Sequence, residues 1–368
     1  MSDDEVRLSL EEVAHLAERV CRAAGYSPSH AGAISRTVTA AERDEARSHG
    51  LFRIPFYVNA LEEGGVSPDT EPEVSQPAPG VVRVDARWAF APRALEVGLP
   101  YVAEAARESG IAALSVVNAF NVAALWPEVE RLAEDGLVAM AFTASLSYVA
   151  PAGGSEPLYG TNPMAFAWPR EGKPPLVFDQ ASSAAARGEI QLRKRDGESI
   201  PEGWAIDSAG EPTTDPAAAL EGAQLPFGGH KGSSIALMIE LLAGALLGDL
   251  FSFEASEADA AGTGAPRGGE LIIAMDPQRF IPGPTETTPA TKSTAGDTSE
   301  NDGASGASAA SQFEHSPLAH AERLFSRVLA QEGARLPGDR RYAARRRTRA
   351  EGVSVPRSFY EELLALTH

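Results

Sequence analysis

Residues 111–117 read Ile-Ala-Ala-Leu-Ser-Val-Val, a short and almost wholly apolar run that predicts a buried β-strand. Helical sequence lies on both sides of it, at residues 92–109 and 122–134. Further strands are expected at residues 81–84 and 137–144, so strands and helices alternate through this part of the chain. This alternation is typical of an α/β fold, in which helices pack on a central sheet.

Toward the N-terminus the pattern becomes helical. Ser9 and Glu12 form a capping box, and apolar residues then recur at helical spacing up to Gly25. Ser27 and Pro28 open a second helix, and a short third helix is expected at residues 55–61. We therefore predict an N-terminal helical segment over residues 1–75 and an α/β domain with a central mixed sheet over residues 76–281.

On the C-terminal side, strands are expected at residues 164–168, 176–179 and 269–275, and the most apolar helix at residues 233–247. Between residues 282 and 312 the composition changes to small and polar residues, which predicts a disordered low-complexity insertion. Helices are expected again at residues 319–330 and 357–366. The C-terminal part, residues 313–368, is predicted to pack back on the N-terminal segment.

Composition excludes several classes of protein. With 368 residues, 43% hydrophobic and 23% charged, the chain resembles an ordinary globular protein. Its net charge of −19 argues against nucleic acids and anionic membranes as partners. No apolar run is long enough to span a bilayer, no signal sequence is present, and Cys21 is the single cysteine, so we expect a cytoplasmic location.

Common catalytic motifs are missing from the sequence. No Gly-x-Gly-x-x-Gly follows a predicted strand, and there is no Walker loop and no Gly-x-Ser-x-Gly elbow. Histidines and carboxylates do not occur at metal-ligand spacing, so no metal site is predicted. A Rossmann dinucleotide site and serine hydrolysis are therefore not supported.

A different set of chemical groups occurs in the segment from Arg47 to Pro55, which reads Arg-Ser-His-Gly-Leu-Phe-Arg-Ile-Pro. His49 can give or take a proton near neutral pH, and the neighbouring hydroxyl of Ser48 can orient the ring. Arg53 can grip a carboxylate through two parallel hydrogen bonds. The alternative is a plain helix end, in which Ser48 and Gly50 only terminate the helix.

Two loops could bind anions or ligands. Residues 228–232, Gly-Gly-His-Lys-Gly, precede a helix and offer free backbone N–H groups and Lys231, which suits a phosphate. The alternative is a tight loop that lets the helix pack closely. Residues 159–163, Tyr-Gly-Thr-Asn-Pro, form a polar turn that could present a hydroxyl, although such a sequence is also typical of a simple turn.

Two charged segments complete the candidates. Residues 335–341, Arg-Leu-Pro-Gly-Asp-Arg-Arg, with the arginines that follow at 345–349, could hold a cofactor phosphate or could be a solvated helix face. Two carboxylates could pair with a histidine or could be surface charges. They are Asp179, at the end of a predicted strand, and Glu189, which follows Arg187 and Gly188.

Taken in order, several motifs make the chain resemble the malate/L-lactate dehydrogenase family, whose NAD(P)H-dependent oxidoreductases do not use a Rossmann fold. Within that family the chain is most similar to Δ1-piperideine-2-carboxylate/Δ1-pyrroline-2-carboxylate reductases. The motifs are the Ser-His-Gly-Leu-x-Arg-Ile-Pro of residues 48–55, Ala-Ala-Leu-Trp-Pro of 123–127, Gly-Thr-Asn-Pro of 160–163, Val-Phe-Asp of 177–179, Pro-Phe-Gly-Gly-His-Lys-Gly-Ser of 226–233, Phe-Ser-Phe-Glu of 251–254 and the arginine-rich 335–341.

The resemblance implies roles for individual residues. His49 is the expected proton donor, with Ser48 as its relay partner and Glu189 as the relay carboxylate. The implied substrate-binding residues are Arg53, Thr161, Arg187 and Gly188. The residues implied to bind the cofactor are Asn121, Val122, Ala123, Ala124, Leu125, Asp179, Gln180, Ala181, His230, Lys231, Arg335, Gly338, Asp339, Arg340 and Arg341.

The implied reaction is reduction of a cyclic 2-imino acid by NADPH, with NADH as the alternative cofactor, in a homodimer that takes a small anionic imino or oxo acid. Three positions depart from the family pattern: Asn121 and Arg187 stand where histidine is usual, and Glu189 stands for aspartate. Two alternatives stay open. One is an NAD(P)-dependent 2-hydroxy acid dehydrogenase of the malate, lactate or ureidoglycolate type, and the other is a non-catalytic homologue.

Overall fold

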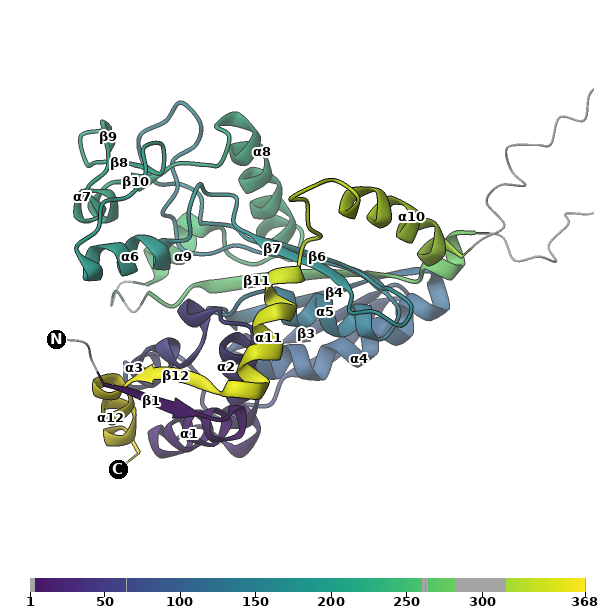
Figure 1. Ribbon diagram of the computed structural model, residues 1–368, viewed down its shortest axis with the longest axis horizontal. Helices are drawn as coiled ribbons and strands as arrows, with labels where there is room; N and C mark the ends of the chain where they lie inside the picture. The colour runs from purple at the N-terminus through teal and green to yellow at the C-terminus, as the bar shows by residue number, and fades with distance from the viewer. Residues whose placement is uncertain (1–3, 64, 260–261, 263, 282–315, 368) are drawn as a thin grey trace, which may run out of the picture.

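The computed structural model describes residues 4–63, 65–259, 262, 264–281 and 316–367 (Figure 1). The predicted insertion at residues 282–312 lies outside them. The central sheet consists of β2 (Glu73–Ala78), β3 (Val81–Asp85), β4 (Ile111–Phe120), β5 (Val138–Thr143), β6 (Met164–Trp168), β7 (Leu176–Gln180) and β11 (Arg267–Met275). The strand order is β2-β3-β4-β11-β5-β6-β7. Because β3 and β4 run parallel and the other neighbours antiparallel, the expected α/β fold with a central mixed sheet is confirmed.

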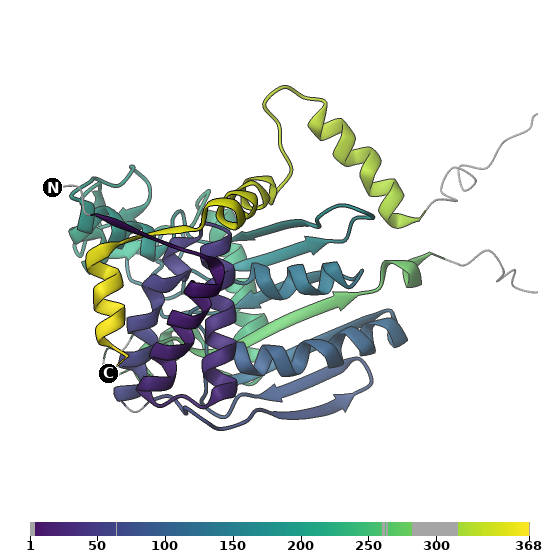
Figure 2. The same cartoon turned by 60° about the horizontal axis from the view of Figure 1, so that its bottom comes forward.

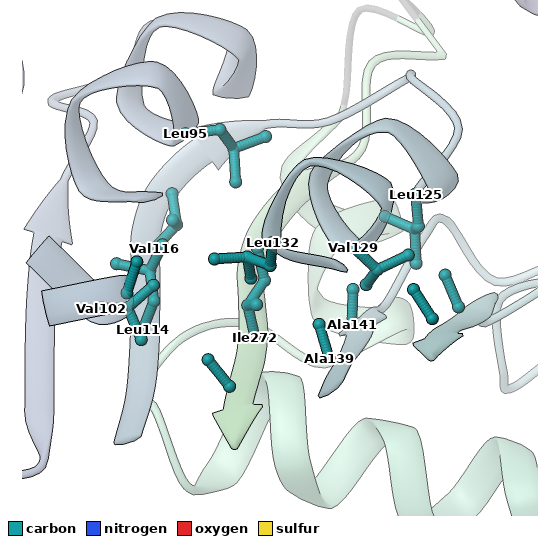
Figure 3. Close-up of a cluster of buried hydrophobic side chains, with 14 of the residues drawn as sticks. Leu95, Val102, Leu114, Val116, Leu125, Val129, Leu132, Ala139, Ala141 and Ile272 are labelled. Atoms are coloured by element: carbon teal, nitrogen blue, oxygen red, sulfur yellow. The ribbon is translucent and has the colours of Figure 1, made fainter. Parts of the chain in front are cut away.

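Helices cover both faces of this sheet. On one face lie α4 (Ala91–Ser109) and α5 (Trp126–Glu134), and on the other lie α8 (His230–Ile239) and its π-helical continuation, Glu240–Ala245 (Figure 1). Strand β11 shows the alternation, because Ile272 faces α4 and α5 while Leu271 faces the α8 side. Figure 3 shows the hydrophobic core that the sheet forms with α4 and α5. Full burial of each large aliphatic side chain contributes about 1.5–3 kcal/mol.

The two ends of the chain meet in a second structural unit. Its elements are β1 (Glu5–Leu8), α1 (Leu10–Ala24), α2 (Pro28–Arg43), α3 (Ile54–Glu62), β12 (Val353–Pro356) and α12 (Arg357–Ala365). Strand β1 pairs antiparallel with β12, so the two ends of the chain, purple and yellow, lie side by side (Figure 2). Side chains of α1, α3 and α12 share one hydrophobic core. The predicted capping box at Ser9 and Glu12 is present.

The other elements lie around these two units. They are α6 (Arg187–Asp196), β8 (Ala205–Ile206), β9 (Pro212–Thr213), α7 (Pro216–Glu221), β10 (Ala223–Gln224), α9 (Ser252–Ala258), α10 (Pro317–Leu329) and α11 (Asp339–Glu351). Helix α10 packs through Phe325 near β6 and β7, away from the N-terminal helices, whereas α11 packs on α2. Among the described residues, no helix has the length and apolar character needed to cross a bilayer.

One predicted helix begins later than expected. The sequence predicts a helix over residues 122–134, but α5 starts at Trp126. Side chains occupy the N–H groups of the preceding segment: Ala123 N donates to Asn121 Oδ1, and Leu125 N donates to Asp179 Oδ2. Pro127, in the first turn of α5, is typical of a helix start.

Candidate active site

A cavity of about 410 Å³, here called the central cavity, lies where the N-terminal unit meets the central sheet and the start of α6. It is lined by segments that are far apart in the sequence: the link between α2 and α3, the loop after β4, the turn before β6 and the start of α6. The predicted site residues in its wall are Ser48, His49, Arg53, Asn121, Val122, Ala123, Thr161, Arg187 and Gly188.

A buried carboxylate shapes the segment that carries His49. Helix α2 ends at Arg43, and two 3₁₀ turns, Arg47–His49 and Leu51–Arg53, follow it. Glu42 accepts a hydrogen bond from Leu51 N at 2.7 Å, and the carboxylate approaches so closely that a Cβ at Gly50 would collide with it. The segment therefore turns sharply and brings His49 and Arg53 to the same cavity.

His49 has a polar neighbour and a cationic one. Its Nδ1 lies 3.0 Å from Ser48 Oγ, and Arg53 Nε donates to Ser48 O at 2.8 Å. Burial, assisted by the charge of Arg53, lowers the pKa of His49 to about 4. The imidazole is therefore neutral at pH 7 in the free protein, and an anion bound at Arg53 would remove part of this pKa depression.

A second guanidinium group lines the cavity opposite the Ser48–Arg53 segment. The Cζ atom of Arg187 lies 3.8 Å from the ring centroid of Tyr148, and its Nη2 donates to Leu220 O at 3.3 Å. A Cβ at Gly188 would lie 3.6 Å from Arg53 Nη2, an ordinary contact distance, so the start of α6 lies beside Arg53. Two arginines thus face one cavity in a chain of net charge −19, and this local positive charge suits a small anion.

The turn that presents Thr161 rests on a buried pair of polar residues. Thr161 Oγ1 lies 3.4 Å from Ser145 Oγ, and Gly160 leaves no room for a Cβ beside that serine. Asn162, at φ 35° and fully buried, donates from Nδ2 to Glu240 Oε1 at 2.8 Å. The Glu240–Asn162 pair therefore fixes the turn from beneath.

The loop after β4, residues 121–126, is held at both ends by carboxylates. Asn121 Nδ2 donates to Glu270 Oε2 at 2.6 Å, and Asn121 Oδ1 accepts from Ala123 N at 3.1 Å. At the other end, Asp179 Oδ2 accepts from Leu125 N at 2.8 Å and from Trp126 N at 3.2 Å. Burial raises the pKa of Asp179, and these N–H donors and the charge of Arg341 oppose the rise.

A second cavity, of about 580 Å³ and here called the arginine cavity, lies beyond Trp126. Gly338, Arg340 and Arg341 line it together with the Trp126 ring, and the guanidinium of Arg341 lies 4.5 Å from the centroid of that ring. In the described part of the chain, the buried Nη1 of Arg341 has no hydrogen-bond partner. Loop 121–126 therefore extends from the central cavity to the arginine cavity, where the guanidinium group of Arg341 keeps an unpaired N–H among the described residues.

A buried ion-pair network keeps α11 in place beside the arginine cavity. Arg345 donates to both carboxylate oxygens of Asp44, at 2.9 and 2.7 Å, and to Glu130 Oε2 at 2.8 Å. Trp126 Nε1 donates to the same Asp44 at 3.1 Å. Helices α2, α5 and α11 are thereby linked around one aspartate.

The structure corrects the position expected for Glu189. The carboxylate of Glu189 pairs with Arg193 at 3.2 Å, one helical turn further along α6, and about half of its side chain is exposed. It is therefore not a described partner of His49, for which the contact is Ser48. The first turn of α6 directs Gly188 into the cavity and Glu189 along the helix surface.

Several residues expected at the cofactor site line neither cavity in the described part of the chain. His230, Lys231, Gln180 and Arg335 are exposed, and Asp339 accepts a hydrogen bond from Leu336 N at 2.9 Å. Of the other predicted cofactor residues, Ala124 and Leu125 belong to loop 121–126, and Asp179 accepts hydrogen bonds from that loop. Ala181 directly follows Gln180 at the end of β7.

Sequence reasoning missed Tyr148 and Glu270. Tyr148 gives no recognisable signal, because it stands in an irregular segment and meets Arg187 only in the folded chain. Glu270 does give one: it is the single carboxylate in the otherwise apolar run 269–275, which predicts a strand. A charge inside a buried strand is rare without a partner or a function.

Comparisons with known proteins agree with this geometry. Residues 8–309 match the family model described as malate/L-lactate dehydrogenase. A Δ1-pyrroline-2-carboxylate/Δ1-piperideine-2-carboxylate reductase of Pseudomonas aeruginosa is 49% identical, over 98% of this chain and 99% of the relative. A (2R)-3-sulfolactate dehydrogenase (NADP(+)) of Chromohalobacter salexigens is 41% identical, over 97% of each. The crystal structure of a Δ1-piperideine-2-carboxylate reductase from Pseudomonas syringae superposes with a TM-score of 0.86 at 36% identity, over 98% of this chain and 99% of the other.

Proposed function

The chain belongs to the malate/L-lactate dehydrogenase family and is an oxidoreductase, and from this premise we propose that it reduces cyclic 2-imino acids with NADPH. The substrates we propose are Δ1-pyrroline-2-carboxylate and Δ1-piperideine-2-carboxylate, which give L-proline and L-pipecolate. The observation that carries the proposal is the convergence of His49 and Arg53 on one cavity, where a titratable ring lies beside a carboxylate-binding guanidinium. Similarity to reductases named for these two substrates supports it.

The residues around loop 121–126 fit a dinucleotide that spans both cavities. Val122 and Ala123 line the central cavity, and Arg340 and Arg341 line the arginine cavity. The unpartnered Nη1 of Arg341 suits a phosphate oxygen, and the neighbouring arginine favours a cofactor with an additional phosphate, hence NADPH over NADH. When bound, the reduced nicotinamide supplies the hydride.

Two cations position the substrate. Arg53 binds the carboxylate of the imino acid, and Arg187 contributes a second positive charge to the same cavity. The hydroxyl of Thr161 faces the cavity from the turn fixed by Asn162. Orientation of the C=N bond by these groups is the main contribution of the protein to the rate.

His49 supplies the proton. Reduction of a C=N bond adds a hydride at carbon and a proton at nitrogen, and the electron pair of the double bond moves to nitrogen. When a substrate carboxylate neutralises Arg53, the pKa of His49 rises and the ring accepts a proton that it can donate. Ser48 keeps the ring in place through Nδ1, and no contact to Glu189 is required.

A second candidate function keeps the site and changes the substrate. The sulfolactate dehydrogenase relative acts on a 2-hydroxy acid, so reduction of a 2-oxo acid is the alternative. Steady-state NADPH oxidation with both imino acids, pyruvate and oxaloacetate separates the two. We expect kcat/KM for the imino acids to exceed that for the oxo acids by about 100-fold or more, equivalent to about 2.8 kcal/mol. The opposite ranking would establish the alternative, and failure to bind NADPH would indicate a non-catalytic homologue.

We also propose that the protein is a homodimer. The large apolar side chains of Leu237, Leu241 and Leu246 are exposed along α8 and its continuation, with Leu246 at 65%. A row of exposed leucines on one helix supports burial against a second copy of the chain. Sedimentation velocity tests this, and a monomer at micromolar concentration would refute it.

A further inference from the structure

The buried carboxyl group of Glu270 has no role in the mechanism described above. Glu270 is 1% exposed and lies in β11, next to a register shift between Gly268 and Glu270. The neighbouring residues of the strand, from Leu271 onward, are apolar and pack in the two cores of the sheet. A carboxyl group at such a position costs free energy unless another interaction offsets it.

The surroundings of Glu270 offset this cost only in part. Its Oε2 accepts the hydrogen bond from Asn121, but its Oε1 is buried without a partner among the described residues. Burial, together with the carboxylates of Glu128 and Asp179, holds the pKa of Glu270 well above its usual range. The protonated form is therefore favoured, and in that form the carboxyl can still accept the hydrogen bond from Asn121.

Asn121 connects this buried group to the loop that lines both cavities. The amide of Asn121 is fixed in one orientation, because Nδ2 donates to Glu270 while Oδ1 accepts from Ala123 N. The Ala123 contact closes a local turn that competes with helix formation at this end of the loop. Asp179 holds the other end, so the loop is anchored on both sides of Val122 and Ala123.

We propose that Glu270 is a positioning residue for the cofactor. Acting through Asn121, it holds loop 121–126 in the conformation that binds NADPH. The identity of the ligand rests on the proposed function. Glu270 does not contact the central cavity itself, whereas Asn121 lines it. Removal of the carboxyl therefore leaves the amide of Asn121 free to rotate and the loop free to adopt other conformations.

The test measures NADPH affinity by fluorescence titration, independent of turnover. Glu270→Leu removes the acceptor and is expected to weaken binding about tenfold, the effect of one lost hydrogen bond worth about 1.4 kcal/mol. Glu270→Gln keeps an acceptor and is expected to restore affinity to within about threefold of the wild type. Both variants are compared with the wild type by circular dichroism to confirm that they fold.

A double-mutant cycle isolates the route through Asn121. If Glu270 acts through this amide, Glu270→Leu has no further effect on NADPH affinity in an Asn121→Ala background. Effects that add fully, or a Glu270→Leu variant that binds NADPH as tightly as the wild type, would overturn the proposal. Should Glu270→Leu fail to fold, Glu270→Ala replaces it in the same cycle: the proposal predicts about tenfold loss of NADPH affinity with Asn121 present and no further loss in the Asn121→Ala background.

Infrared spectroscopy tests whether the carboxyl group of Glu270 is protonated. At pH 7 the wild type is expected to show the carbonyl band of a protonated carboxylic acid that disappears in Glu270→Gln, and absence of this difference would contradict an uncharged Glu270.

The two proposals fail separately. Tight NADPH binding by the wild type without turnover refutes the imine reductase alone, unchanged affinity in the variants refutes the positioning role alone, and a wild type that does not bind NADPH refutes both.

Discussion

Two buried glutamate–asparagine pairs support the central cavity from different sides, and their surroundings differ. Glu240, 4% exposed, accepts three hydrogen bonds: from Asn162 Nδ2, from Ser252 N and from Ser252 Oγ. Glu270, at 1%, accepts one from Asn121 and has Glu128 and Asp179 as acidic neighbours. A buried carboxylate is stable as an anion only where donors surround it, so the same residue pair has a different electrostatic role at each site.

This difference follows from what each pair holds. The Glu240–Asn162 pair fixes a turn in which Asn162 takes a left-handed conformation at φ 35°, and three donors make that conformation rigid. The Glu270–Asn121 pair holds the end of a loop that lies between the β4 strand and α5, where a cofactor is proposed to bind. The fully hydrogen-bonded pair thus stabilises a turn with a left-handed residue, and we propose that the incompletely paired one positions a loop that binds the cofactor.

The largest expected effect is the loss of the fully paired glutamate. Glu240→Leu leaves the donors of Asn162 and Ser252 buried without their acceptor and should lower the free energy of unfolding by about 4 kcal/mol. Glu270→Leu removes one hydrogen bond and also a carboxyl group whose burial is costly, so its cost should stay below about 1 kcal/mol. Urea denaturation measures both, and equal losses would show that the two pairs do not differ.

The pH dependence of stability tests the acidic neighbours of Glu270. Burial and the charge of Asp179 raise the pKa of Glu128 from about 4.5 to about 8, so the folded protein binds this proton more tightly than the unfolded chain does. The resulting stabilisation is present in full below pH 4.5 and is lost as the pH rises through 8. Between pH 5 and 8 we expect a decrease of about 3 kcal/mol in the free energy of unfolding.

Glu128→Gln is the matched variant for this pH dependence. It cannot ionise, so the decrease between pH 5 and 8 should become smaller, and the part that remains comes from the raised pKa values of Glu270 and Asp179. Unfolding in urea at several pH values gives the slope. A wild type whose stability is constant over this range would show that Glu128 ionises normally and that the acidic neighbours of Glu270 do not repel one another.

The smallest effect comes from the conservative change at both pairs. Glu270→Gln replaces a protonated carboxyl by a neutral amide of the same shape and should change the free energy of unfolding by less than about 0.5 kcal/mol. Glu240→Gln replaces one of the two acceptor oxygens by an NH₂ group, which then faces a donor of Asn162 or Ser252, and should cost about 2 kcal/mol. Thermal unfolding compares the two, and a larger loss for Glu270→Gln would contradict the difference in hydrogen bonding between the two pairs.

Local patterns were sufficient to predict most of the fold. The apolar run at 111–117, the capping box at Ser9 and the apolar segment before Leu247 became β4, α1, and α8 with its π-helical continuation. The start of α5 was wrong by four residues, because two side chains accept hydrogen bonds from the preceding backbone: the nearby Asn121 from Ala123 N, and Asp179 of the distant strand β7 from Leu125 N. Contacts of that kind depend on tertiary structure and leave no local signal.

The candidate site was predictable where one segment carries several groups and less so where the fold must bring groups together. Ser48, His49 and Arg53 lie within six residues, and all three line the central cavity. Glu189 was misplaced as a partner of His49, because one residue of helix rotation decides whether a side chain faces a cavity or a neighbour such as Arg193. The role of Glu270 depends on the packing of β11 against α5 and could not be read from the strand alone.

The most direct test of the proposed reaction is kcat/KM for Δ1-pyrroline-2-carboxylate in His49→Ala compared with the wild type, at saturating NADPH and pH 7. Loss of a positioned proton donor in the central cavity predicts a decrease of about 10²- to 10⁴-fold. A His49→Ala enzyme that keeps the wild-type kcat/KM would contradict the assignment of His49 as the proton donor and, with it, the mechanism built on this cavity.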